Sequence, residues 1–235
     1  MKLTLEPYSS QSERLPQSGR HILAQFDDQA IVVYQAFRPA IGHWAAGGHS
    51  LGGEFSFERM SWIKTSFLWM MYRSGWATKP GQEVVLAVWL KRAGFEAILA
   101  EAVLSTFDST RYPDESTWSA AVAHSTVRLQ WDPDRTPGGR SLGRRTIQLG
   151  LRDRTLTGYA DEWILEIEDI TDFVREQAPH IRSMEGRRDL LVPRVEVYWP
   201  ASNEAAAHIG LVQPGESAKP LQAVLVGPVP SYPTL

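Results

Sequence analysis

The sequence predicts a single α+β domain in which a mixed or mainly antiparallel central sheet packs against helices. Strand and helix patterns are intermixed, and several strands are adjacent in the chain, which is typical of this class. Residues 83–90 form a continuous apolar run, as expected of a strand that is buried on both faces. Residues 95–103 repeat apolar side chains at helical spacing, which predicts an amphipathic helix.

The composition is that of a globular protein and excludes several kinds of site. The 235 residues are 43% hydrophobic, enough for a sizeable core. Cysteine is absent, which excludes disulfides, thiol catalysis, zinc–thiolate sites and iron–sulfur clusters. The net charge of -3 gives no general attraction to nucleic acid or anionic membranes, although a local basic patch could still exist. Without a long apolar run or a signal-peptide pattern, we expect a cytoplasmic protein with no membrane partner.

The composition also divides the chain into three parts. Residues 1–19 are rich in Ser and Gln and lack periodicity, which predicts a disordered leader. Residues 20–200 carry the strand and helix patterns and form the domain. Residues 201–235 contain several prolines and no amphipathic period, which predicts an irregular tail.

The remaining elements of the domain follow from local patterns. Apolar, β-branched or alternating runs predict further strands at 21–26, 30–37, 55–57, 126–131 and 145–151. Capping residues and helical spacing predict helices that begin at Pro39, Asp114 and Thr171, and one that covers residues 155–169. Residues 132–144 read as a loop, and residues 191–199 as an edge strand or an extended arm.

We expect residues 58–79 to form the centre of the domain and one wall of any site. Six apolar side chains follow one another from Phe67 to Tyr72, and a helix that is apolar on all sides belongs inside a domain. We expect this helix at about residues 65–74, with Thr65 as N-cap and Gly75 just after its end. Four cations lie in the same stretch, and buried cations need partners. They are Arg59, Lys64, Arg73 and Lys79.

Motifs for common chemistries are missing. The six histidines show no metal-ligand spacing, so no metal site is predicted. No GxSxG motif marks a serine nucleophile. The acidic residues of the helix predicted at 155–169 lie opposite its apolar stripe, which favours a solvated surface over acid–base catalysis.

The strongest constellation consists of polar side chains on elements that we expect to be buried. Arg128, Gln130 and Asp132 share one face of a strand and should point the same way. A cleft lined by cations, amides and aromatic rings would suit an anionic ligand with a flat base. The residues of this constellation are Tyr34, Gln35, Arg59, Lys64, Arg73, Arg128, Gln130, Asp132 and Gln148.

A structural role explains the same residues equally well. In this interpretation Arg59 and Arg73 pair with Asp132, Glu58 or Glu83 as buried struts. Arginines of the loop at 132–144 and just after it would add phosphate contacts, or would simply form a flexible basic loop. They are Arg135, Arg140, Arg144 and Arg145.

Several stretches resemble a known family. Residues 59–76 read RMSWIKTSFLWMMYRSGW, and YQAF, QWDP and RTIQLG begin at Tyr34, Gln130 and Arg145. Together they resemble the family named domain of unknown function 4291, from about residue 20 to residue 200. Thr65 departs from the proline expected there, which alters the start of the helix. The resemblance implies kinship but no activity.

A weaker resemblance concerns the ADP-ribosyltransferases, which place a Tyr or His and an Arg near a first strand and a Gln/Glu-x-Glu element later. Tyr34, Arg38 and Gln130-x-Asp132 come in a similar order, with Asp132 in place of a glutamate. The resemblance implies NAD as donor. Nicotinamide departure builds positive charge on the ribose, which a carboxylate can stabilise while arginine holds the pyrophosphate.

The leading hypothesis is therefore a nucleotide-using transferase of ADP-ribosyltransferase type, with NAD as cofactor and nucleic acid or protein as acceptor. Its catalytic residues would be Asp132, Gln130 and Tyr34, and its cofactor-binding residues Arg38, Arg59, Trp62, Lys64 and Arg73. One alternative is a non-catalytic module that binds nucleic acid, a nucleotide or another anionic small molecule. The other is a structural or scaffold protein in which the central block is only core.

Overall fold

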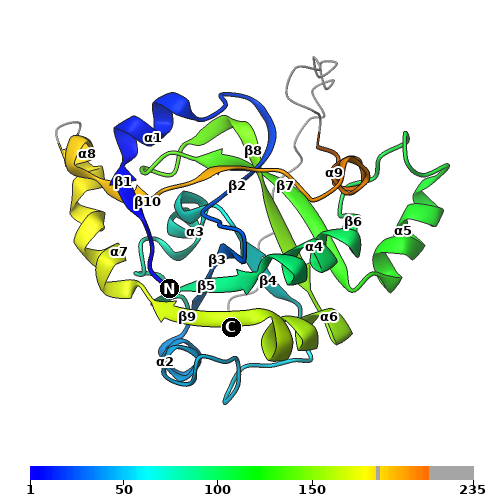
Figure 1. The fold of residues 1–235 in the computed structure, drawn as a ribbon, viewed down its shortest axis with the longest axis horizontal. Helices are drawn as coiled ribbons and strands as arrows, with labels where there is room; N and C mark the ends of the chain where they lie inside the picture. The colour runs from blue at the N-terminus through cyan, green and yellow to red at the C-terminus, as the bar shows by residue number, and fades with distance from the viewer. Residues whose placement is uncertain (184–185, 212–235) are drawn as a thin grey trace.

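The computed structural model describes residues 1–183 and 186–211. It is a single α+β domain built on a mixed, mostly antiparallel sheet with helices packed against it, so the predicted fold class is confirmed (Figure 1). The strands are β1 (Leu5–Pro7), β2 (Gly19–Ala24), β3 (Ala30–Phe37), β4 (Ser61–Lys64), β5 (Val84–Lys91), β6 (Ala102–Leu104), β7 (Val127–Arg135), β8 (Ser141–Leu151), β9 (Ile164–Asp169), β10 (Leu191–Pro193) and β11 (Glu196–Tyr198). The helices are α1 (Tyr8–Arg14), α2 (Pro39–Gly48), α3 (Phe67–Ser74), α4 (Arg92–Ala100), α5 (Glu115–His124), α6 (Asp153–Gly158), α7 (Thr171–Gln177), α8 (Gly186–Asp189) and α9 (Asn203–Ile209).

Strand β8 pairs with three other strands of the main sheet. Along one edge it pairs with β7, and along the other it pairs first with β2 and then with β4. The sheet continues from β4 through β3 and β5 to β9, and β11 extends it beyond β2. The pairs β2–β8 and β6–β7 are parallel. The antiparallel pairs are β2–β11, β3–β4, β3–β5, β4–β8, β5–β9 and β7–β8.

The long pair β3–β5 separates two hydrophobic cores. Alternate residues of β5 belong to different clusters: Leu86 and Val88 to one, Val85 and Ala87 to the other. Successive side chains of a strand point to opposite faces, so this strand is buried on both sides, as its continuous apolar run predicts.

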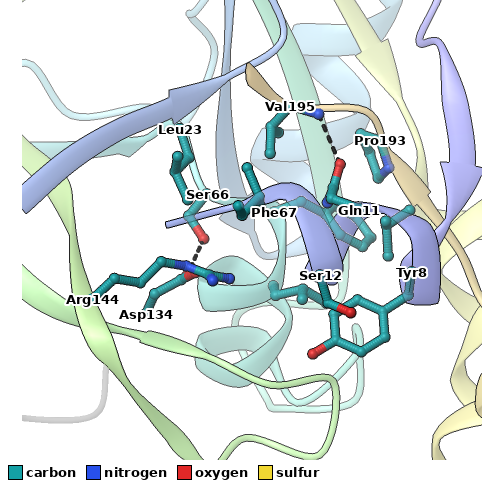
Figure 2. A pocket seen from close by; sticks show the side chains of 13 residues that line it. Tyr8, Gln11, Ser12, Leu23, Ser66, Phe67, Asp134, Arg144, Pro193 and Val195 are labelled. Carbon is teal, nitrogen blue, oxygen red and sulfur yellow. Dashed lines mark hydrogen bonds and ion pairs between the residues drawn. The ribbon is translucent and has the colours of Figure 1, made fainter. Parts of the chain in front are cut away.

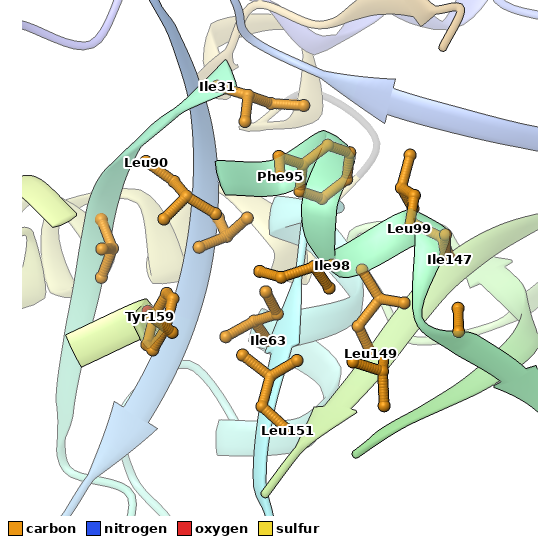
Figure 3. Close-up of a cluster of buried hydrophobic side chains, with 14 of the residues drawn as sticks. Ile31, Ile63, Leu90, Phe95, Ile98, Leu99, Ile147, Leu149, Leu151 and Tyr159 are labelled. Carbon is orange, nitrogen blue, oxygen red and sulfur yellow. The ribbon is translucent and has the colours of Figure 1, made fainter. Parts of the chain in front are cut away.

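Helix α4 covers the first core (Figure 3). Its residues Phe95, Ile98 and Leu99 are fully buried, as the helical spacing predicts, and lie among side chains of the sheet such as Ile63 and Leu149. Removal of this apolar surface from water is the main favourable contribution to folding.

Helix α3 lies over the second core and carries the central apolar run. Ser66, rather than Thr65, is its N-cap, because the Ser66 hydroxyl accepts a hydrogen bond from the backbone N–H of Trp69. Gly75 follows the helix with φ of 58°, a conformation that favours glycine, as predicted. Phe67 packs edge-on against Tyr34 of β3, which fixes the helix to the sheet.

Residues 1–19 form β1 and α1, so the expectation of a disordered leader is wrong. β1 pairs with β10, and the Gln11 side chain accepts a hydrogen bond from the backbone N–H of Val195 at 2.8 Å. Leu3 and Leu15 are buried. The partners lie at the other end of the chain, so local composition carried no sign of them.

The prediction of a helix at residues 155–169 is also wrong in its second half. α6 ends at Gly158, a π-helical turn covers Tyr159–Trp163, and residues 164–169 form β9 instead. β9 pairs with β5, whose backbone groups need partners along that edge. The acidic residues Glu166 and Glu168 therefore lie on a strand and not on a helix face.

The C-terminal region expected to be irregular contains α9. The Ser202 hydroxyl caps its start by accepting the Ala205 N–H at 3.0 Å, and Gly210 ends it with φ of 78°. Residues 212–235 of the predicted tail lie outside the described residues. Within the described part, no helix combines the length and apolar character needed to cross a membrane.

A buried ion pair joins distant parts of the fold (Figure 2). Arg144 Nε donates to Asp134 Oδ2 at 2.7 Å, and both side chains are only 4% exposed. The Ser66 hydroxyl donates to the other carboxylate oxygen at 2.8 Å, and a second nitrogen of Arg144 donates to the Pro16 carbonyl at 3.1 Å. The pair thus links β7, β8, the start of α3 and the N-terminal segment.

This arrangement predicts a large cost for breaking the pair. Asp134→Ala should lower the free energy of unfolding by about 3–5 kcal/mol, because it leaves the Arg144 charge buried without its carboxylate. Glu196→Ala is the matched control: it breaks the exposed Arg194–Glu196 pair and should cost at most about 1 kcal/mol. Urea titrations of both variants measure the difference. Equal, small losses would contradict a structural role for the buried pair.

Candidate functional site

A cleft of about 600 Å³ opens where β3 and β4 diverge. The two strands are in register only at Tyr34 and Lys64, and beyond this point they separate. The cleft is lined by residues 35–38, 54–56, 59–64 and 80–82, together with Ile41, Trp69, Met70, Arg73 and Gln148. We refer to this space as the cleft.

The cleft carries an excess of positive charge. Four of its lining residues are cations, and among the described lining residues only Glu54 is acidic. They are Arg38, Arg59, Lys64 and Arg73. Arg38 is engaged by Glu54 in an exposed ion pair at the rim. Arg59 is exposed, and no ion pair involves it within the described part of the chain. All five residues predicted to bind a cofactor, the four cations and Trp62, are thus brought together.

Trp62 lies flat on the sheet because residue 150 is a glycine. Gly150 stands opposite Trp62 on β8, and a Cβ at this glycine would come within 3.0 Å of two carbons of the indole and 2.6 Å of Met60 Sδ. Any other residue would therefore push the ring away from the strand. Trp62 remains half-buried and lines the cleft, so it can offer a flat aromatic surface there.

Lys64 is the buried cation of the cleft. Its side chain is 1% exposed, its Nζ donates to Asp132 Oδ2 at 2.9 Å, and the same atom lies 4.0 Å from the centre of the Trp69 ring. Burial lowers the pKa of Lys64 to about 8, although the Asp132 carboxylate opposes the shift. The amine can therefore exchange a proton near neutral pH, which an arginine could not do.

Gln148 lies beside Lys64 on the sheet. It stands opposite Lys64 on one side and Gln130 on the other. Gln148 is 7% exposed and lines the cleft, and its Oε1 is buried with no hydrogen-bond partner among the described residues. A buried polar atom left unpaired is costly, so this one is a candidate to meet a donor from a ligand.

The three predicted catalytic residues are placed differently from the cofactor-binding set. Asp132 and Gln130 lie on β7 and do not line the cleft, but Asp132 reaches it through Lys64. Tyr34 is fully buried against Phe67, its hydroxyl has no hydrogen-bond partner in the described part of the chain, and burial raises its pKa above the ordinary value. Tyr34 therefore belongs to the core beneath the site.

Gln35 and Tyr159 hold the cleft wall in place. The Tyr159 hydroxyl donates to Gln35 Oε1 at 2.8 Å, and Gln35 Nε2 donates to the Ser61 hydroxyl at 2.9 Å and to the Trp62 carbonyl at 3.2 Å. Sequence reasoning missed Tyr159 and Gly150. A glycine inside a strand often marks the close approach of another group, so Gly150 carried a usable signal.

The buried struts and the basic loop expected from the sequence differ in the structure. Asp132 pairs with Lys64 rather than with Arg59 or Arg73, and both arginines are exposed on the cleft. The predicted basic loop is instead the β7–β8 hairpin, in which Arg144 forms the buried ion pair with Asp134. In residues 1–183 and 186–211, no group of three or more His, Asp or Glu side chains is placed to hold a metal ion.

The pKa of Lys64 predicts a pH dependence of stability. Its folded pKa of about 8 lies below the ordinary value of 10.5, so between these pH values the unfolded chain binds more protons than the folded protein. Lys64 therefore destabilises the fold at pH 7, and this penalty is lost as the pH rises through the window. Compared with Lys64→Met, the wild type should gain stability from pH 7 to pH 9.5. Unfolding titrations at both pH values check this, and a constant difference would contradict it.

The family comparison covers this region. A family model described as "Domain of unknown function (DUF4291)" matches residues 21–198, from within β2 to the end of β11. No curated protein matches the sequence. The family match gives no support to the weaker similarity to ADP-ribosyltransferases. The matched region includes every residue that lines the cleft, and the chain belongs to the DUF4291 family.

Proposed function

We propose that the protein binds a nucleotide in the cleft and uses it as the donor of a transferred group, with NAD as the first donor to test. The observation that carries the proposal is the flat Trp62 surface on Gly150, bordered by the cations Arg59 and Arg73. A planar base and a phosphate group are the two parts of a nucleotide that such a surface recognises.

The base would stack on the face of Trp62 that the sheet leaves uncovered. Stacking of a base on an aromatic side chain is worth about 1–3 kcal/mol and tolerates different bases. Tyr34, predicted as a catalytic residue, lies in the core below, so the ring contact falls to Trp62.

The phosphates would lie against Arg59 and Arg73, whose exposed guanidinium groups can each offer two parallel hydrogen bonds. Arg38 also lines the cleft, where it pairs with Glu54. The unpaired Gln148 Oε1 would accept a hydrogen bond from a hydroxyl or amino group of the ligand.

Group transfer is proposed to take place beside Lys64, the lining residue that holds Asp132. Asp132 does not line the cleft itself, and a sugar that reaches Lys64 would bring its developing positive charge near this carboxylate as the leaving group departs. Gln130 lies on the same strand two residues away, in register with Gln148.

Binding tests the first half of this proposal. Trp62→Ala should weaken the binding of ADP by roughly 5- to 150-fold, which corresponds to the loss of one stacking contact. Trp44→Ala is the matched control, because Trp44 is 57% exposed on α2 and does not line the cleft. Isothermal titration calorimetry measures both. Equal affinities for ADP in the two variants, or no binding to the wild type, would contradict the proposal.

Turnover tests the second half. Asp132→Asn keeps the shape of the side chain but loses its charge, so the variant should retain ADP binding and release nicotinamide from NAD far more slowly than the wild type. Chromatographic detection of nicotinamide measures the rate. Unchanged release in the variant would remove Asp132 from the reaction.

A further inference from the structure

Lys64 differs from the other described lysines in its surroundings. Lys2, Lys79 and Lys91 are exposed, whereas Lys64 is enclosed between the sheet and α3. Its amine has one carboxylate partner, Asp132, and one aromatic ring, Trp69, which covers it on the side of α3.

The neighbouring ion pair on the same strand shows what a structural pair looks like in this fold. Asp134, two residues after Asp132, is paired with an arginine, and hydrogen bonds from Ser66 and to Pro16 complete that network away from the cleft. Arginine stays charged in proteins and suits a permanent strut. The pair that faces the cleft uses lysine, whose amine can lose a proton and become a nucleophile.

We propose that Lys64 is a nucleophilic amine that forms a Schiff base with the reducing sugar of a nucleotide such as ADP-ribose. The proposal rests on the proposed function, since it places the base on Trp62 and the phosphates against Arg59 and Arg73. The open-chain ribose then extends toward the buried end of the cleft, where its aldehyde meets Lys64 once the Trp69 ring moves aside.

The step balances as an ordinary condensation. The Lys64 ammonium transfers a proton to the Asp132 carboxylate, and the neutral Nζ attacks the aldehyde carbon to give a carbinolamine. The carbinolamine hydroxyl leaves as water with the proton returned by Asp132, and a carbon–nitrogen double bond forms. No oxidant, reductant or metal takes part.

The electrostatic surroundings are consistent with this role. Burial lowers the pKa of Lys64 to about 8, while Asp132 and Asp134 raise it and Arg135 lowers it further. The neutral amine is therefore a substantial minority near pH 7, in contrast to an exposed lysine.

Reductive trapping tests the inference. The full-length protein is incubated with ADP-ribose and cyanoborohydride, and the modified peptides are identified by mass spectrometry. Reduction adds the mass of ADP-ribose less one oxygen atom. We expect at least tenfold faster modification at Lys64 than at Lys2, Lys79 or Lys91, and we expect excess ADP to suppress it. Equal rates at all four lysines would overturn the proposal.

Variants keep the test specific. Lys64→Arg keeps the charge and should lose the fast modification at residue 64. Lys79→Arg, which removes an exposed lysine near the Tyr72 ring, should keep the fast modification at Lys64. Asp132→Asn removes the carboxylate that raises the pKa of Lys64, so the half-maximal rate of trapping should move to lower pH. Fast modification by ADP-ribose that survives in Lys64→Arg, or a pH profile of trapping that is unchanged in Asp132→Asn, would contradict the role proposed for Lys64.

The two proposals fail in different ways. If ADP binds through Trp62 but ADP-ribose is not trapped at Lys64, the Schiff base is wrong and nucleotide binding stands. If ADP does not bind but ribose 5-phosphate is trapped selectively at Lys64, the nucleophilic lysine stands and the nucleotide is wrong.

Discussion

The contact between Lys64 and Asp132 is the constraint on which the site depends. It joins β4 to β7 across β8, and it keeps an ammonium group buried against the sheet. A charge at that depth is tolerated only with a partner, so the strand order and the register of β8 must place the carboxylate there. The same register puts Gln148 beside Lys64, which makes a polar row across the face of the sheet.

The cleft follows from how the neighbouring strands end. β3 and β4 share a single registered pair, so the sheet opens immediately beyond it, and Gln35 of β3 spans the gap by donating hydrogen bonds to Ser61 and to the Trp62 carbonyl of β4. Gly150 then lets Trp62 lie flat on β8. The result is an aromatic surface held by regular strands, with arginines at its border, which is a suitable geometry for recognising a planar anion.

Much of this could be predicted, because the block at residues 59–76 combines unusual density of cations and aromatic rings with a strong apolar run. The pattern pointed to Arg59, Trp62 and Lys64, which all line the cleft, and α3 beside them lies over the second core. The Lys64–Asp132 contact could not be predicted, because it joins residues 68 apart in sequence through strand register. The same limit applies to β9, whose local sequence favours a helix, and to the N-terminal segment, whose composition favours disorder, because in both cases the pairing strand is distant in the chain.

The most direct measurement is a crystal structure of the protein grown with ADP. We expect the adenine to stack on Trp62 and the diphosphate to lie within hydrogen-bonding distance of Arg59 and Arg73. Nucleotide bound at another surface, or a cleft that stays empty at a concentration that saturates binding in solution, would contradict this expectation.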